Sequence, residues 1–453
     1  SKYVSKLATG EWCGSYCLTE PGAGSDANSG KTKAVLSEDG THYKITGQKM
    51  WISNAGFAHV FIVFARIGDD KNITGFIVPK DLENGITLGE EENKLGIKAS
   101  STRQVFFNET KVPVENMLAG RGDGFKIGMN ALNVGRIKLA AACLEAQRRV
   151  TTLAIQYATE RVQFKTPIAQ FGAIQQKLAT MATNTYVSES ASYRAAFDIE
   201  EKIAQLLEQG LSHQEAELKG VEEFAIECSI LKVSVSEKAQ DCTDEGIQIY
   251  GGMGFSADAP MEMAWRDARI ARIYEGTNEI NRMLCVGMLL KKGFKGEIDL
   301  MSAATKVGQE LMEGIPKAEL ANTFFAEEKN LLQNLKKAML MITGAAVQTF
   351  GPKFDKEQQI ILALSDILIE IYMIESAILR TEKNCERYGI DSQKNQIEMT
   401  QLYLFDVIEK INSKGKEALV SFAEGAQLKG MIAGLKQYTK YQNYPNVVAL
   451  RRN

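Results

Sequence analysis

Two glutamates lie four residues apart in the segment IYEGTNEINR, residues 273–282, on either side of a Gly-Thr pair. A carboxylate such as Glu275 can remove a proton from carbon when it is positioned against a weakly acidic C–H bond. A purely structural interpretation also stands, because Thr277 can cap a helix and Glu279 in its first turn suits the positive end of the helix dipole. These ten residues alone favour the structural interpretation, so a chemical role needs support from elsewhere in the chain.

A glycine-containing loop, YCLTEPGAGSDANSG at 16–30, could hold an anionic group. Gly22 and Gly24 carry no side chain, so backbone amides there can approach a ligand closely. The loop is not a P-loop, because no GK[ST] follows, and no βαβ unit surrounds it as a dinucleotide motif would require. Taken alone, the loop is equally consistent with a simple turn.

Three further stretches combine a possible ligand contact with a structural alternative. In KMWISN, 49–54, Trp51 could stack on a planar cofactor ring or belong to the core. In ATERVQF, 158–164, Arg161 could bind a phosphate through two hydrogen bonds or form a surface ion pair. In IQIYGGMGF, 247–255, the glycine pair again allows close approach of the backbone.

The composition argues against several other kinds of site. The chain has 453 residues and a net charge of −3, with no basic stripe, which gives no reason to expect nucleic-acid binding. His42, His59 and His213 have no ligand spacing to a cysteine or to each other, so we expect neither a metal site nor a Ser-His-Asp apparatus. The 7 cysteines form no CxxC pair and are typical of buried thiols in a reducing compartment.

The elements that must position these residues change character along the chain. Residues 11–118 contain several short strand-like runs without intervening helices, and Asp39-Gly40 between two of them is a hairpin signal. We therefore expect an antiparallel β-sandwich or barrel. Residues 125–292 have long stretches of helical periodicity, which predict an antiparallel bundle. The charged piece at 200–220 is expected to be a solvated helix end or a helical excursion.

The last third of the chain is again helical in pattern, after a linker at 293–299. Its segment NLLQNLKKAMLMI places four apolar residues on one face, Leu331, Leu335, Ala338 and Ile342. The most apolar stretch, 360–379, carries three acidic residues, so we expect a buried amphipathic helix rather than a membrane span. No cluster of catalytic residue types occurs in 300–453, and its expected role is packing or association.

Taken together, the motifs resemble the acyl-CoA dehydrogenase family. YCLTEPGAGSD, MWIS, ERVQF, IQIYGGMGF and RDARIARIYEGTNEI occur in that family's order, and the resemblance runs from about residue 3 to residue 292. LNVGR at 132–136 and the helical segment after 292 resemble the very-long-chain acyl-CoA dehydrogenases, whose members carry an extra C-terminal helical domain and form homodimers. The implied fold is α+β and multidomain.

The resemblance also implies a division of the chain into parts. Residues 1–10 would be the end of an N-terminal helical domain, most of which is missing from this sequence. Residues 11–120 would form the β domain with the flavin and substrate loops, 121–292 a four-helix bundle with the catalytic base, and 300–453 the C-terminal helical extension. The insertion at 200–220 departs from the family pattern.

The reaction that the resemblance implies is the FAD-dependent dehydrogenation of a long-chain acyl-CoA to a trans-2-enoyl-CoA. A base must take the α proton while donors stabilise charge on the thioester carbonyl, and a flavin accepts the hydride from the β carbon. Glu275 matches the family's base. Some branches place their glutamate at the position of Gly135, which carries no competing base here. Electrons would then pass to an electron-transfer flavoprotein.

The resemblance assigns further residues to the cofactor. Those expected to bind FAD from the same subunit are Tyr16, Leu18, Thr19, Trp51 and Ser53, with Thr277 and Glu279 near its diphosphate or adenosine. Those expected to reach the cofactor of a neighbouring subunit are Arg161, Phe164, Gln248, Gly251 and Gly252. Because a carboxylate near a diphosphate would be repelled, we expect Glu279 to act through its backbone or to turn away.

The residues assigned to the acyl-CoA substrate are Ser25 at the pantetheine arm, Asn133 at the acyl entrance, Gly276 beside the thioester and Arg136 near the acid loop. Arg136 could orient the carboxylate or form a buried structural ion pair. The sequence does not settle the length of the acyl chain.

Two other functions stay open. An acyl-CoA oxidase would give the same product but pass electrons to oxygen, and an assembly or scaffold relative would use the C-terminal helices as an interaction surface, with dispensable catalysis. We expect a bacterial cytoplasmic location, with the mitochondrial matrix as the alternative. Contact of 300–453 with a membrane surface stays open, although packing against the bundle is the expected use.

Overall fold

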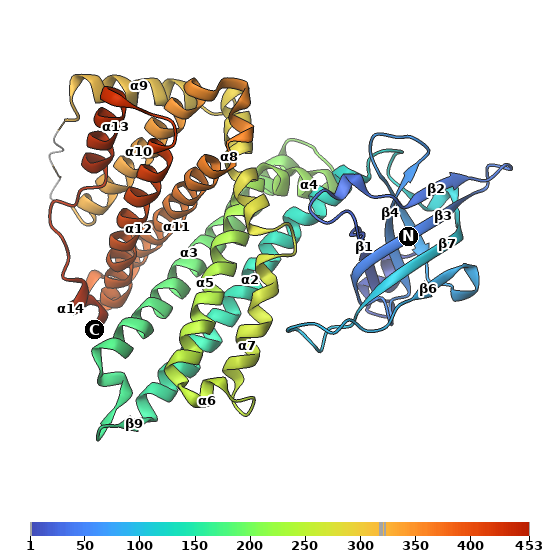
Figure 1. Cartoon of the computed structure of the whole chain (residues 1–453), viewed down its shortest axis with the longest axis horizontal. Helices are drawn as coiled ribbons and strands as arrows, with labels where there is room; N and C mark the ends of the chain where they lie inside the picture. Colours follow the sequence, from blue (N-terminus) through green and yellow to red (C-terminus); the bar gives the residue numbers. More distant parts are fainter. Residues whose placement is uncertain (1, 317–319, 321–322, 453) are drawn as a thin grey trace. The chain divides into compact units, whose positions relative to one another are not determined.

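The computed structural model describes residues 2–316, 320 and 323–452 (Figure 1). Contacts between Cα atoms divide the chain into two compact units, Ser1–Leu132 and Asn133–Asn453. The border falls inside helix α2 (Gly124–Glu160), so the first turns of this helix belong to the β unit and the remainder to the helical unit. A β region followed by helices confirms the predicted α+β fold class.

The first unit is built on a mixed eight-stranded sheet, preceded by the short helix α1 (Val4–Ala8). The strands are β1 (Gly14–Cys17), β2 (Lys33–Leu36), β3 (His42–Ser53), β4 (Val60–Ile67), β5 (Thr74–Pro79), β6 (Ile86–Leu88), β7 (Thr102–Pro113) and β8 (Met117–Leu118). Their spatial order is β6-β7-β3-β2-β4-β5-β8, with β1 paired to β4, and the described strands do not close into a barrel.

Strand pairing in this sheet departs from the expected antiparallel pattern at β4. This strand pairs in parallel with both β1 and β2, whereas the other pairings in the sheet are antiparallel. Parallel neighbours need a long connection, and the loop and the β2–β3 hairpin supply it between β1 and β4. The predicted hairpin at Asp39-Gly40 is confirmed, with Leu36 paired to Tyr43 and Gly40 in the left-handed region at φ 68°.

The second unit contains the predicted bundle. Its long helices are the remainder of α2, then α3 (Gly172–Glu208), α5 (Ala225–Tyr250) and α8 (Asn278–Phe294). Shorter elements connect them, namely the hairpin β9 (Val162–Gln163) to β10 (Thr166–Pro167), α4 (His213–Glu223), α6 (Gly252–Phe255) and α7 (Pro260–Ala268). The charged piece at 200–220 is the end of α3 followed by α4, which packs along α3 and begins with a capping box of Ser212 and Glu215.

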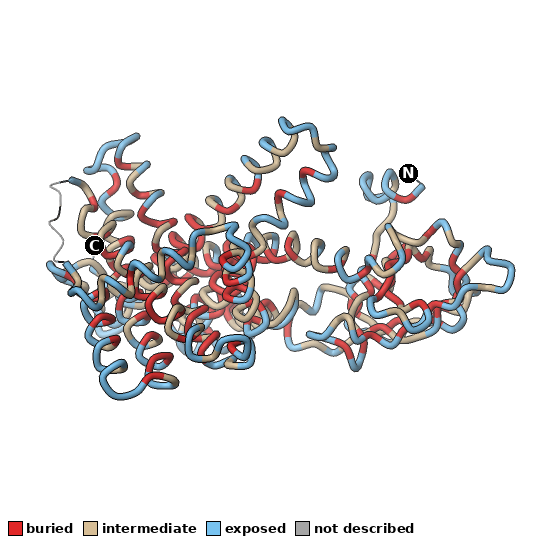
Figure 2. Tube along the Cα trace, turned by 90° about the horizontal axis from the view of Figure 1, so that it is seen from above, coloured by how far each residue is buried: buried red, intermediate tan, exposed pale blue. Residues whose placement is uncertain are grey.

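Six further helices complete this unit: α9 (Leu300–Glu313), α10 (Ala326–Phe350), α11 (Gln358–Tyr388), α12 (Lys394–Val420), α13 (Gly425–Tyr438) and α14 (Val447–Arg452). Helix α11 contains the apolar stretch 360–379 and packs against α3, α8, α10 and α12, which confirms a buried helix. Buried residues gather where these helices meet (Figure 2), and among them are the four residues of the predicted apolar face of α10. None of the helices within the described residues is long and apolar enough to cross a bilayer.

Candidate active site

Glu275, the residue predicted to be the base, lies in a strained turn just before α8. Its φ is 58° and that of Gly276 is 78°, both in the left-handed region. This backbone conformation is costly for a residue with a side chain and persists only where the surrounding structure holds it. Two other predicted site residues, Trp51 at φ 60° and Phe164 at φ 52°, share the property. The same region also holds six non-glycine residues that were not predicted to belong to the site, so for Trp51 and Phe164 the conformation by itself assigns no role.

The turn is held by hydrogen bonds from Asn281, whose side chain is fully buried. Its Nδ2 lies 3.3 Å from the carbonyl oxygen of Glu275, 2.8 Å from that of Gly276 and 3.0 Å from that of Thr277. The Thr277 hydroxyl accepts a hydrogen bond from the amide of Ile280 at 3.2 Å, which confirms its predicted role as a helix cap. The peptide units around Glu275 are therefore fixed from the start of α8.

Glu279 keeps its structural interpretation in this turn. Hydrogen bonds from its own backbone amide and from the Thr277 hydroxyl lower the pKa of its carboxyl. This agrees with the expectation for a carboxylate in the first turn of a helix, where the dipole favours negative charge.

The carboxylate of Glu275 rests against Gly135 on α2. A Cβ atom added at Gly135 would lie 2.6 Å from Oε2 and 2.8 Å from Cδ of Glu275, far inside ordinary contact distance. The space above this glycine is therefore taken by the carboxylate itself, and no larger residue fits there unless Glu275 moves.

Burial raises the pKa of Glu275 above its usual range, while Arg136 and Lys232 oppose that rise. Arg136 is also buried, and its Nε donates to the carbonyl oxygen of Glu275 at 3.3 Å. Its Nη1 donates to Asn133 Oδ1 at 2.9 Å and to Ser229 Oγ at 3.4 Å. Arg136 therefore contacts the backbone carbonyl of Glu275 by hydrogen bond. Asn133, which was predicted to lie at the acyl entrance, is buried and hydrogen-bonded to Arg136.

A second buried network, which the sequence motifs did not indicate, lies beside the same turn. Lys232 Nζ donates to Asn278 Oδ1 at 2.6 Å, and Nδ2 of Asn278 donates to Glu237 Oε1 at 3.0 Å. Arg282 donates to both carboxylate oxygens of Glu237 at 2.8 Å and to Asp366 on α11 at 2.9 Å. An ion pair thus ties the C-terminal helices to the helix that follows the base.

In the first unit, a buried ion pair anchors the glycine-containing loop. Lys49 Nζ lies 2.7 Å from Glu20 Oε1 and donates to the carbonyl oxygen of Leu18 at 3.1 Å. Glu20 also accepts hydrogen bonds from the backbone amides of Lys31 at 2.6 Å and Thr32 at 3.1 Å. The loop is therefore more than a simple turn. The sequence did not single out Lys49 or Glu20, because a lysine within a strand pattern usually indicates a solvent-facing position.

The ends of β1 and β3 bring several predicted flavin residues together. The amide of Met50 donates to the carbonyl oxygen of Thr19 at 2.9 Å, and the Ser15 hydroxyl donates to that of Ser53 at 2.7 Å. Trp51, next in the chain to Met50, is 53% exposed, so the alternative of a core tryptophan is wrong. The other predicted residues here are exposed or half-buried, namely Tyr16, Leu18 and Ser25.

The residues predicted to serve a neighbouring subunit gather at the end of the bundle that carries β9 and α6 (Figure 1). Tyr157 and Tyr250 stack with ring centroids 4.0 Å apart and join the ends of α2 and α5 there. Phe164 is 92% exposed in the β9–β10 hairpin. Gln248 lies about 24 Å along α5 from Lys232, at the helical rise of about 1.5 Å per residue. Also exposed at this end are Arg161, Gly251 and Gly252.

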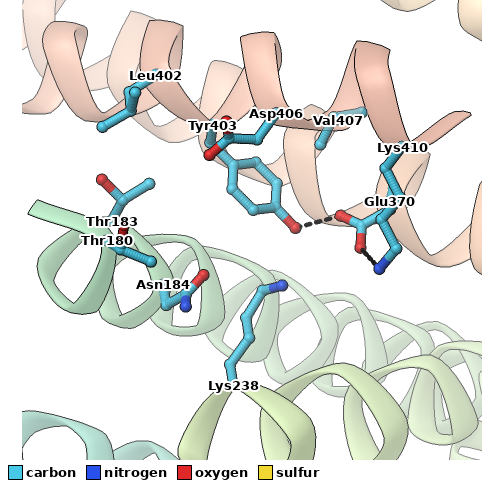
Figure 3. Close-up of a pocket in the computed structure, with 10 residues that line it drawn as sticks. All are labelled: Thr180, Thr183, Asn184, Lys238, Glu370, Leu402, Tyr403, Asp406, Val407 and Lys410. Carbon is cyan, nitrogen blue, oxygen red and sulfur yellow. Dashed lines mark hydrogen bonds and ion pairs between the residues drawn. The ribbon is translucent and has the colours of Figure 1, made fainter. Parts of the chain in front are cut away.

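A separate polar pocket of about 150 Å³ lies between α3, α5, α11 and α12 (Figure 3). Its buried Glu370 accepts hydrogen bonds from the Tyr403 hydroxyl and from Lys410 Nζ, both at 2.5 Å. None of the residues predicted to bind the cofactor or the substrate lines this pocket. The pocket therefore belongs to the packing between the bundle and the C-terminal helices.

Three regions of the chain match models of known domains. Residues 15–110 match the acyl-CoA dehydrogenase middle domain, and residues 122–289 and 334–437 each match an acyl-CoA dehydrogenase C-terminal domain. A probable acyl-CoA dehydrogenase of Bacillus subtilis (strain 168) is 42% identical over 439 residues, which is 97% of this chain and 73% of that protein.

Two further relatives agree with these matches. The mitochondrial very long-chain specific acyl-CoA dehydrogenase of Macaca fascicularis is 43% identical over 290 residues, which is 62% of this chain and 41% of that protein. A crystal structure of acyl-CoA dehydrogenase complexed with FAD from Bacillus anthracis superposes with a TM-score of 0.94 at 42% identity and covers all of this chain and 76% of that one. The domain matches, the relatives and the fold agree with the motifs that surround Glu275: this chain belongs to the acyl-CoA dehydrogenase family.

Proposed function

We propose that the chain carries the catalytic centre of an FAD-dependent acyl-CoA dehydrogenase, with Glu275 as the base that takes the α proton. The observation that supports this most is the half-buried carboxylate of Glu275, which sits on a strained turn against Gly135. Burial raises its pKa, which brings the carboxyl towards the range in which a base works near neutral pH. A glutamate that only began a helix would need neither the burial nor the left-handed backbone.

In the proposed reaction, the α C–H bond of the acyl thioester breaks and its proton passes to the carboxylate of Glu275. The electron pair of that bond forms the new double bond as the β hydrogen leaves with its own electron pair. When bound, FAD supplies the acceptor for this hydride. The backbone amide of Glu275 is the proposed donor to the thioester carbonyl, where charge develops. Arg136 holds the other face of that residue through its carbonyl oxygen.

The exposed aromatic and glycine residues fit a planar cofactor with a phosphate arm. Trp51 offers an exposed ring beside the anchored loop of the first unit. A Cβ atom at Gly251 or Gly252 would meet nothing within 4 Å, so the backbone there is open to a ligand. Because Phe164 and this glycine pair lie at the far end of the bundle from Lys232 and the base turn, we assign them to the cofactor of a neighbouring subunit in a homodimer.

We further propose a long-chain acyl-CoA substrate, since the base region is part of a stretch shared with a relative named very long-chain specific. Electrons would leave through an electron-transfer flavoprotein. The Bacillus relatives favour the bacterial cytoplasm over the mitochondrial matrix as the location.

The test is a series of acyl-CoA substrates of increasing chain length, added anaerobically to the purified flavoprotein while the flavin absorbance is followed. In the parent protein, acyl-CoA should bleach the flavin absorbance, most strongly when the acyl chain is long. In Glu275→Gln this bleaching should be lost. Substantial bleaching of the flavin in Glu275→Gln would contradict the assignment of Glu275 as the base. Peroxide formed in air without an added acceptor would identify an oxidase instead. A cell phenotype that survives Glu275→Gln but not deletion of 300–453 would identify an assembly protein.

A further inference from the structure

Lys232 is a buried cation on α5 that the proposed reaction leaves unexplained. Its side chain is fully buried, and its ammonium donates to Asn278 Oδ1 at 2.6 Å. Asn278 stands at the start of α8, next to the turn that holds Glu275. Burying a lysine is costly unless an opposite charge neutralises it. The position therefore calls for a reason other than packing.

The acid that shares a hydrogen-bond partner with Lys232 is already bound to another cation. Glu237 shares Asn278 with Lys232, but both of its carboxylate oxygens bind Arg282 at 2.8 Å. Arg282 also binds Asp366 at 2.9 Å. In the described part of the chain, no ion pair within 4.0 Å includes Lys232.

The titratable and charged groups that face Lys232 and Glu275 come from α2, from α5 and from α8 with the turn before it. They are Arg136, Cys143, Cys228, Glu237, Tyr274, Glu279 and Cys285. Burial raises the pKa of Cys143 to about 11 and the pKa values of Cys228, Cys285 and Tyr274 to about 12, so all four are neutral at pH 7.

The charges that remain beside the carboxylate of Glu275 are therefore mainly positive. Glu279 is exposed at the surface, and Glu237 is bound to Arg282. Arg136 and Lys232 are both buried, and both lower the pKa of Glu275 against the effect of burial.

We propose that Lys232 is a positioning residue whose positive charge keeps the carboxylate of Glu275 ionised at neutral pH, and so able to accept the α proton. This rests on the proposed role of Glu275 as the base. A base must be ionised before it takes a proton, and burial by itself favours the neutral acid, which cannot act. Burial also lowers the pKa of Lys232 to about 8, so the lysine remains about 90% protonated at pH 7.

The first test is the pH profile of kcat/KM for the holoenzyme. In Lys232→Met, the acid limb of this profile should move to a pH about one unit higher. At pH values below the limb, kcat/KM should therefore be about ten-fold lower than in the parent, and at alkaline pH it should be unchanged. Lys232→Arg retains the charge and should restore the acid limb. A limb that stays in place in Lys232→Met overturns the proposal.

The second test uses thermal unfolding at pH 7 and needs no turnover. Lys232→Met should raise the Tm, because it removes a buried ammonium that lies in no ion pair within 4.0 Å with any residue that the structure describes. The matched control is Lys410→Met (Figure 3), which strands the buried Glu370. It should lower the Tm without moving the acid limb. A fall in Tm together with an unmoved acid limb would mark Lys232 as merely structural and overturn the proposal.

A double-mutant cycle then separates this proposal from the proposed function. In the Glu275→Gln background, Lys232→Met should raise the Tm by more than it does in the parent, because no attraction between the two charges is lost there. Equal Tm shifts in both backgrounds overturn the proposal for Lys232, whatever the turnover. Retained turnover in Glu275→Gln would instead overturn the proposal that Glu275 is the base. The double-mutant cycle uses only Tm values, so its result does not depend on turnover.

Discussion

Replacing Gly135 by alanine should displace the proposed base while leaving the helix intact. The new Cβ would lie 2.6 Å from Oε2 of Glu275, whereas ordinary contact begins at 3.4 Å, so the carboxylate must move by about 0.8 Å. A misplacement of about 1 Å at a reacting group can cost about 100-fold in rate. Alanine is also favoured over glycine within a helix by about 1 kcal/mol, which offsets local strain. We therefore expect kcat to fall on the order of 100-fold in a folded protein.

The matched control for this experiment is Gly287→Ala on α8, where an added Cβ meets nothing within 4 Å. It brings the same gain in helix propensity without touching the carboxylate, so its kcat should equal that of the parent. Both variants are compared by anaerobic flavin bleaching with acyl-CoA and by thermal unfolding. If Gly135→Ala kept its kcat within about three-fold of the parent, the carboxylate would not be acting from the position seen here, and the reasoning from contact distance would fail.

Three further predictions concern buried polar groups, one in the first unit and two in the second. Lys49→Met should lower the stability of the first unit by about 3–5 kcal/mol in urea unfolding, because it leaves Glu20 buried without a partner, and adding Glu20→Gln should recover much of the loss. Asn281→Ala removes three hydrogen bonds to the base turn, so kcat should fall and amide hydrogen exchange over 273–282 should quicken. The pKa of Glu370 is lowered from 4.5 to about 2, so the stability it contributes is present above pH 4.5 and is lost as the pH falls towards 2. That loss amounts to about 3 kcal/mol, and acid unfolding of Glu370→Gln should be flatter over this range.

Features encoded in short stretches of sequence could be predicted. The hairpin at Asp39-Gly40 follows from a turn residue that tolerates positive φ between two alternating runs. The cap at Thr277 and the buried face of α10 follow from residue type and helical spacing. Each of these signals is complete within about a dozen residues, so no knowledge of the distant chain was needed.

The interactions that the sequence did not reveal join residues far apart in the chain. Lys49 pairs with Glu20, and Arg282 pairs with Asp366. The sequence on either side of Lys49 or Arg282 does not indicate that a buried acid lies beside it. The parallel pairing of β4 with β1 has the same origin, since it depends on where the hairpin between them folds. Local patterns predict which residues are buried but not which buried charges meet, because that depends on the path of the whole chain.

The strain at Glu275 and the unneutralised charge of Lys232 have a common explanation in the carboxylate between them. A left-handed backbone costs about 1–3 kcal/mol at a residue with a side chain, and glycine at position 275 would avoid it. In the same unit the buried Glu370 is paired with Lys410, whereas Lys232 and Arg136 lie in no ion pair within 4.0 Å among the described residues. Packing alone would select against both costly features. The proposed role of Glu275 as a base would explain both features, because such a carboxylate has to be half-buried, ionised and held in one orientation.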